Sequence, residues 1–146
     1  MTKREQLLQV VEQDVQLDCT DYLSLRGLMQ ELYQQLLERN SSQIDLLNAQ
    51  VSSLVDQVRL RAQRRSKILA AFALGADNTA LQQLFALFPE SRGDHLRRAW
   101  EQLGQLAAQC KQLNERNGKL LAMHNDILSQ LLGDGRDAQL YTPQFF

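Results

Sequence analysis

Apolar residues recur at every third or fourth position along most of this 146-residue chain, and this spacing limits the fold more than any other feature of the sequence. It is the period of an α-helix that buries one face. From about Lys3 to Glu38, eight of nine stripe positions are apolar and the other is aspartate: Leu8, Val11, Val15, Asp18, Tyr22, Leu25, Met29, Leu32 and Leu36. Further apolar residues at positions 7, 28, 33 and 37 widen the stripe, which favours a bundle over a two-stranded coiled coil.

A second helix is predicted from Ser42 to Leu74. The segment RNSSQID interrupts the first stripe, Ser42 is a plausible N-cap, and Asp45 lies near the positive end of the new helix. A second apolar stripe then continues to Phe72, and Gly75 is the candidate residue for ending the helix. Because the connection is short, we expect 3–38 and 42–74 to form an antiparallel hairpin.

Two further helices are predicted after the hairpin. A short one within ALQQLFALF presents Leu81, Leu84, Phe85 and Phe88, and PESRGD ends it. A long one begins with Asp94 as its cap and runs to Leu132, about 58 Å at 1.5 Å per residue. We therefore expect an all-α fold: an antiparallel bundle of three long helices and a short one over 1–132, followed by a mobile tail over 133–146.

Bulk properties exclude several classes of function. The formal net charge of −1 gives no global attraction to nucleic acid or to a membrane surface. The N-terminus lacks an apolar signal segment and no run approaches about 18 uncharged apolar residues, so we expect a cytoplasmic protein without membrane insertion. Cys19 and Cys110 should then be reduced. No phosphate loop, Cys-x-x-Cys pair or Glu-x-x-His motif is present, and we predict no enzymatic activity, metal or cofactor.

The histidines and Cys110 could carry chemistry, but each has a simpler structural interpretation. His95 and His124 lie on the same predicted helix but 29 positions apart, too far for a shared metal site. We interpret His124 as a partly buried residue of the helix seam and Cys110 as a small core residue.

Five cations are concentrated between Arg59 and Lys67, in RLRAQRRSK. They could bind nucleic acid or an acidic protein, which would make the chain a regulator. However, apolar residues at 58, 62 and 69 place the buried face on another side, and no aromatic residue is interleaved for base stacking. Cations are also favoured near a helix C-terminus. We therefore interpret this segment as a solvated helix face.

Weak helix formers interrupt the last long helix near its middle. Asn114, Asn117 and Gly118 lie at i, i+3 and i+4 and form one surface patch, although Asn and Gly cost roughly 0.5–1 kcal/mol each relative to Ala. Either the patch bonds to another backbone, or it marks a kink or the helix register within the monomer. The helix beyond it is unusually apolar, which suits a partner helix. The candidate binding residues are Asn114, Asn117, Gly118, Leu120, Leu121, Met123, Ile127, Leu128, Leu131 and Leu132.

LNERNGKLL, the apolar helix after it and LYTPQ together resemble the FlgN-type flagellar export chaperones. That family has Leu-Asn-x-x-Asn-Gly-x-Leu-Leu late in the chain, followed by Leu-Tyr-Gly and a polar tail. The length, the long N-terminal hairpin and the paired Arg64–Arg65 agree as well, and the specific part of the resemblance is 113–141. The chain departs from the family pattern after Tyr141, where it has Thr142-Pro143 in place of Gly.

The resemblance implies a cytosolic chaperone, without ATPase activity, that binds hook-associated proteins and prevents their premature aggregation. It would deliver them to the flagellar type III export gate, with the export ATPase as a further candidate partner. The resemblance also implies that the helix over 94–132 binds the client and that Tyr141 docks on the gate. From the residues alone, the apolar tail with Leu140, Phe145 and Phe146 could equally fold back onto the bundle. The alternative function is a structural helical-bundle protein that self-associates through the same apolar face.

Overall fold

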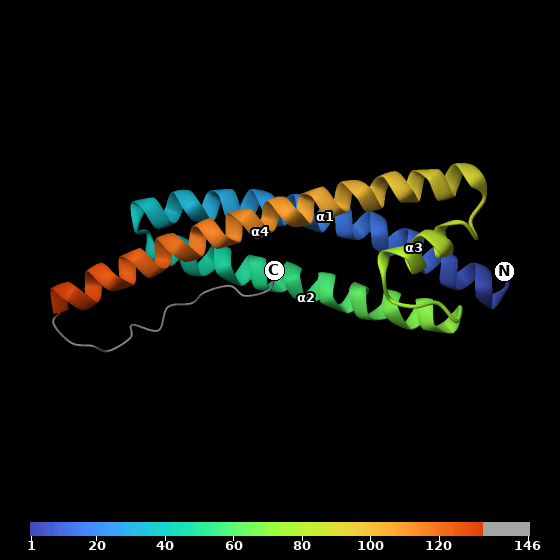
Figure 1. Ribbon diagram of the computed structural model, residues 1–146. Coiled ribbons are helices and arrows are strands. Elements are labelled where there is room, and N and C mark those ends of the chain that lie inside the picture. The colour runs from blue at the N-terminus through green and yellow to red at the C-terminus, as the bar shows by residue number, and fades with distance from the viewer. Residues whose placement is uncertain (133–146) are drawn as a thin grey trace.

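The computed structural model describes residues 1–132, apart from the side chains of Leu128 and Leu132, and shows four helices (Figure 1). Three are long: α1 (Lys3–Glu38), α2 (Ser41–Ala71) and α4 (Glu90–Leu132). The fourth, α3 (Asn78–Phe85), is short and covers the end of the bundle at which α2 finishes. Over the described residues there is no strand, so the predicted all-α fold is confirmed.

Local hydrogen bonds explain where the hairpin helices begin and end. Thr2 and Glu5 form a capping box at the start of α1, and Arg39 ends it with a left-handed backbone (φ 55°). The predicted cap of α2 was wrong: Asn40 is the N-cap, and its Oδ1 accepts from the N–H of Gln43 at 3.4 Å. The Ser42 hydroxyl donates to the same oxygen, because a carboxamide oxygen has room for two donors.

The ends next to the short helix also differ from the sequence prediction. Ala73 (φ 57°), and not Gly75, supplies the left-handed residue after α2. α4 begins at Glu90, four residues before the predicted cap Asp94, because the Pro89 carbonyl accepts the N–H of Gly93 and so opens the helix earlier. A Cβ on Gly93 would lie 2.7 Å from the carbonyl oxygen of Phe85, so only glycine allows this close approach of α4 to α3.

α1 lies between the other two long helices. It is antiparallel to α2 and runs parallel to α4, as Figure 1 shows, and α4 is therefore antiparallel to α2. Among the described residues, no Cα atom of α2 lies within 8 Å of one of α4, whereas α1 packs closely against both. The packing of the bundle therefore depends on two seams, α1–α2 and α1–α4.

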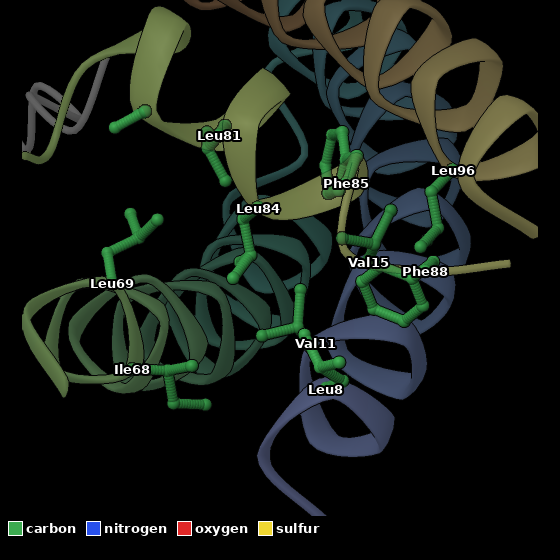
Figure 2. Close-up of a cluster of buried hydrophobic side chains, with 11 residues drawn as sticks. Leu8, Val11, Val15, Ile68, Leu69, Leu81, Leu84, Phe85, Phe88 and Leu96 are labelled. Carbon is green, nitrogen blue, oxygen red and sulfur yellow. The ribbon is translucent and has the colours of Figure 1, made fainter. Parts of the chain in front are cut away.

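The core is divided into three clusters along the bundle. The α3-end cluster is the largest and contains side chains from all four helices, which point toward one another in Figure 2; it comprises Leu8, Val11, Val15, Ile68, Leu69, Ala80, Leu81, Leu84, Phe85, Phe88 and Leu96. The middle cluster comprises Leu25, Met29, Val51, Val55 and Cys110. The tip cluster, next to the α1–α2 connection, has only three buried members, Leu32, Leu36 and Leu47. The apolar stripe predicted for α1 supplies buried residues to all three clusters.

Candidate functional site

Three side chains tie α4 to α1 by hydrogen bonds to main-chain carbonyls. The Cys19 thiol of α1 lies 3.6 Å from the carbonyl oxygen of Ala99, and the Cys110 thiol of α4 lies 3.6 Å from that of Tyr22. Burial raises the pKa of the Cys110 thiol to about 11, so it is a neutral core residue, as predicted. The third donor is Asn117, whose Nδ2 lies 2.9 Å from the carbonyl oxygen of Met29.

The asparagine patch faces α1 within the same molecule. Asn117 is 1% exposed and Asn114 is 8% exposed, while Gly118 is half-buried. Asn117 therefore bonds to another backbone, as one interpretation of the sequence required, but that backbone belongs to its own bundle. This geometry matches the interpretation in which the patch fixes the register of α4 within the monomer.

Four carboxamide oxygens near the tip cluster are buried without a hydrogen-bond partner among the described residues. They belong to Gln35 of α1, Asn48 of α2, and Asn117 and Asn125 of α4. An unsatisfied buried acceptor costs about 1–3 kcal/mol. Each of the three long helices contributes at least one of them, so this end of the bundle is packed with polar groups that its own partners do not satisfy.

Beyond the asparagine patch, α4 has an inner and an outer face. Leu120 and Leu121 pack against the tip cluster and are half-buried. Met123, Ile127 and Leu131 follow one another at intervals of four and so share a face. Met123 is 55% exposed and Leu131 is 76% exposed, which leaves an apolar face of α4 uncovered by the described part of the chain.

α4 continues past the end of the hairpin. His124 lies close enough to Arg39, the residue that ends α1, for burial and then that cation to lower its pKa. His124 is half-buried in the seam, as predicted. The remaining turns, 125–132, are about 12 Å long and extend beyond the α1–α2 connection (Figure 1). We call this segment the overhang.

The basic segment over 59–67 is only in part the solvated helix face that the sequence analysis predicted: Arg59, Arg64 and Lys67 are exposed, whereas Arg61 is buried and Arg65 is half-buried. Arg61 is buried and donates to Asp18 and Asp21 of α1. Arg65 donates to Asp18 at 2.9 Å, and Arg64 makes a two-pronged contact with Asp14 at 2.7 Å. Burial acts to lower the pKa of Arg61, but its hydrogen bonds to Asp18 and Asp21 outweigh burial, and the pKa is raised. The interpretation failed for these arginines because the aspartates that pair with them lie on another helix.

The cations of α2 also reach α4. The guanidinium of Arg65 lies 4.8 Å from the ring centroid of Trp100, whose Nε1 donates to the Asn78 side chain at 3.1 Å. Trp100 packs edge-on against Phe85, with ring centroids 6.3 Å apart. One signal in the sequence could have revealed the network: Asp14, Asp18 and Asp21 recur on one side of α1 at intervals of four and three, and Arg64 and Arg65 follow Arg61 at three and four positions.

Two further features, a cluster of metal-binding side chains and a membrane-spanning helix, are absent from the described residues. Residues 1–132 hold no group of three His, Cys, Asp or Glu side chains that could bind a metal ion. Within the same range, no helix is long and apolar enough to span a bilayer. Tyr141 and the remainder of 133–146 lie outside the described residues, as do the side chains of Leu128 and Leu132, so their predicted roles stay predictions.

Comparison with known proteins gives one match. The model of the FlgN family, described as FlgN protein, matches residues 1–143 and therefore covers nearly the whole chain. No curated protein and no solved structure matches the chain.

Proposed function

We propose a function from one premise: this chain belongs to the FlgN family, whose members are flagellar export chaperones that bind hook-associated proteins. In our proposal the C-terminal half of α4 binds a terminal, aggregation-prone helix of such a client in the cytoplasm. The chaperone keeps the client from assembling prematurely and delivers it to the flagellar type III export gate. The family consists of chaperones and not of enzymes, and our proposal involves no cofactor.

The uncovered face of α4, which begins at Met123 and continues into the overhang, is the observation that carries this proposal. Met123 and Leu131 expose most of their side chains, and Ile127 lies between them on the same face. Burying one such side chain against a partner is worth roughly 1.5–3 kcal/mol before the cost of association. Two or three of them therefore supply the core of a helix-in-groove contact, and the flexible Met side chain adapts to clients of different shape.

The rest of the predicted client-binding residues would take part in a second step. Asn114, Asn117, Leu120 and Leu121 contact the hairpin in the free molecule, so a client reaches them only after this half of α4 has moved away from α1. The unsatisfied carboxamide oxygens lower the cost of that movement, and donors from the client helix would satisfy them. In this proposal the mid-helix asparagines keep α4 in register while leaving it weakly held.

Tyr141 is proposed to act after the client is bound. It follows the overhang by nine residues in the chain, and by its position in LYTPQ it corresponds to the family tyrosine that docks on the export gate. An aromatic ring with a hydroxyl group combines apolar area with a hydrogen bond, which is typical of interface anchors.

Paired variants separate client binding from delivery. Met123→Asp with Leu131→Asp places two carboxylates on the proposed contact face without touching the buried clusters. We expect at least a 100-fold loss of affinity for a hook-associated protein fragment in calorimetry. The matched control is Leu46→Asp with Leu60→Asp on α2, where both leucines are about half exposed and affinity should be unchanged. Leu121 is unsuitable for this test because it packs in the tip cluster.

Affinity for the client and export of the client, measured together, test the role of Tyr141. Tyr141→Ala should reduce export of the client strongly and leave its affinity as it was.

Unchanged affinity in a folded Met123/Leu131 variant would contradict the assignment of the contact face. A purified chain that binds no hook-associated protein but loses self-association in that variant would support the alternative, a self-associating structural protein.

A further inference from the structure

Between residues 9 and 34, α1 directs all of its charges but Glu31 toward the other helices. Glu12 pairs with Arg92 of α4, and the three aspartates at 14, 18 and 21 pair with arginines of α2. Arg26 donates to the Gln109 side chain of α4 at 2.8 Å. Between residues 9 and 34, all of which the structure describes, Glu31 is the one charged residue among the exposed positions. The solvent-facing side of α1 is therefore almost free of charge.

That side carries a second stripe with the same spacing of three and four. Its members are exposed, uncharged and located opposite the buried stripe: Gln9, Gln13, Gln16, Thr20, Leu23, Gly27, Gln30, Gln34 and Leu37. We call them the outer stripe. They span about 42 Å of helix. Interface cores are depleted in charged residues, whereas an ordinary solvated helix face is rich in Lys and Glu.

The outer stripe is complementary to itself when two copies run antiparallel. In an antiparallel pair, residues that face each other have numbers with a constant sum. If Leu23 faces Leu23 of a second copy, that sum is 46 or 47, so the stripe pairs Gly27 with Thr20, Gln30 with Gln16 and Gln34 with Gln13. A glutamine side chain both donates and accepts, so glutamine facing glutamine satisfies both partners. A charged stripe would instead place like charges together at the two-fold axis.

The surroundings of Leu23 leave room for a second helix. A Cβ placed on Gly27 would meet nothing within 4 Å, so neighbouring backbone can approach closely there. Beside it, a shallow groove of about 680 Å³ separates α1 from α2 and is lined by Ser24, Gly27, Leu28, Ser53 and Leu54, among others. Leu23 itself is 44% exposed, and Leu17, six residues before it on α1, is 49% exposed. Small residues in the middle and leucines at the margin suit a helix–helix contact.

We propose that the outer stripe is the interface of a homodimer, in which a second copy of this chain packs antiparallel along α1 with the two-fold axis at Leu23. This inference goes beyond the chaperone function, because it involves neither the overhang nor the tail. A contact formed mainly by one helix from each copy falls at or below about 1,200 Å² in total, so the dimer is weak and reversible, with a dissociation constant in the micromolar range or above. The antiparallel arrangement directs the two overhangs to opposite ends of the dimer.

Sedimentation of the full-length chain tests the interface. Wild type should change from monomer to dimer with concentration, and Leu23→Glu should raise the dissociation constant at least tenfold, since it places two carboxylates at the axis. Glutamate is a good helix former, so the monomer should stay folded. Leu60→Glu on α2 is the matched control, with a comparably exposed leucine replaced by the same residue, and should dimerise as wild type does. A monomer at all concentrations up to the millimolar range overturns the proposal.

A cross-link tests the position of the axis. Leu23→Cys should form a disulfide-linked dimer under mild oxidation, because each new thiol faces its own copy. Leu60→Cys should form none beyond the background of the two native cysteines. Equal cross-linking of both variants, or a dimer that persists in Leu23→Glu and is lost in Met123→Asp with Leu131→Asp, would place the contact elsewhere and contradict the assignment.

Discussion

The two ends of the bundle are built in opposite ways. The α3 end combines the largest apolar cluster, contributed by all four helices, with an edge-on aromatic pair and a nearby network of three arginines and three aspartates. The tip end has three fully buried leucines, four unsatisfied carboxamide oxygens and a helix that continues past its neighbours. Both ends belong to the same two seams, so the difference lies in which side chains fill them.

This difference explains how one chain can be both stable and adaptable. The hairpin and the first half of α4 are joined by contacts that are costly to break. The part of α4 beyond residue 115 is held by two half-buried leucines, the Asn117 hydrogen bond and the guanidinium of Arg116, which lies 3.6 Å from the ring centroid of Tyr33. Segments with few buried apolar contacts open first, and binding surfaces that remodel are drawn from them. Stability at the α3 end therefore permits a weakly held tip.

The largest expected effect comes from removing the centre of the charge network. Asp18→Ala removes the buried carboxylate that Arg61 and Arg65 share. Arg61 keeps Asp21, but Arg65 loses its ion-pair partner, and breaking a buried pair costs roughly 3–5 kcal/mol. Denaturant unfolding should show this loss. Asp56→Ala, at an exposed position of α2, is the control and should change stability by less than about 0.5 kcal/mol. A loss below 1 kcal/mol in Asp18→Ala would mean that the network is not what distinguishes the α3 end.

An intermediate effect of opposite sign is expected at the tip. Asn117→Leu removes one hydrogen bond but also removes the unsatisfied Oδ1, and the leucine side chain keeps the same branching with a somewhat larger volume. We expect the free energy of unfolding to rise by about 1 kcal/mol and amide exchange over 117–127 to slow. Asn117→Asp, which adds a charge at the same site, should destabilise instead. If Asn117→Leu weakened the protein as much as Asp18→Ala, the two ends would be equally dependent on their polar contacts.

The smallest expected effect is a pH dependence confined to the tip. The pKa of His124 is lowered by burial and by Arg39, so the unfolded chain binds its proton more readily than the folded chain. The stability that neutral His124 contributes is present at pH values above the ordinary histidine pKa of about 6.5, and it is lost as the pH falls below that value. The protection factors of the amides in the last turns of α4, which correct for the slower intrinsic exchange at low pH, should fall between pH 7.5 and 5.5. His124→Gln should abolish the change, and His95→Gln, at an exposed position of α4, should keep it.

Apolar spacing was enough to predict the elements but not their partners. The bounds of α1 match the predicted 3–38. The apolar stripe runs without a break between the N-cap Thr2 and Arg39, whose left-handed backbone ends the helix. The start of α4 was misplaced by four residues, since the spacing says nothing about the close contact of Gly93 with Phe85. Asp18 was visible as the polar exception in the α1 stripe. The spacing of that stripe does not show that Arg61 and Arg65 of α2 lie opposite it.

The asparagine patch shows the same limit in the candidate site. Its position and its polarity were evident from the sequence, and both a bond to another backbone and a register mark were considered. The choice between an external and an internal backbone depends on the stagger between α1 and α4, which brings Met29 level with Asn117. That stagger is set by packing at the α3 end, far along the chain from the patch.

The parallel course of α1 and α4 has a consequence for the order in which the protein is made. The contacts that join these helices link residues 80 and 88 positions apart in the chain. At about 5–20 residues per second, a ribosome needs roughly 4–18 s to produce that separation. The hairpin of α1 and α2 forms from nearby residues, but its side facing α4 stays bare until the last helix emerges. During synthesis the nascent chain thus exposes the apolar residues of α1 for several seconds, and the bundle closes only after α4 has emerged.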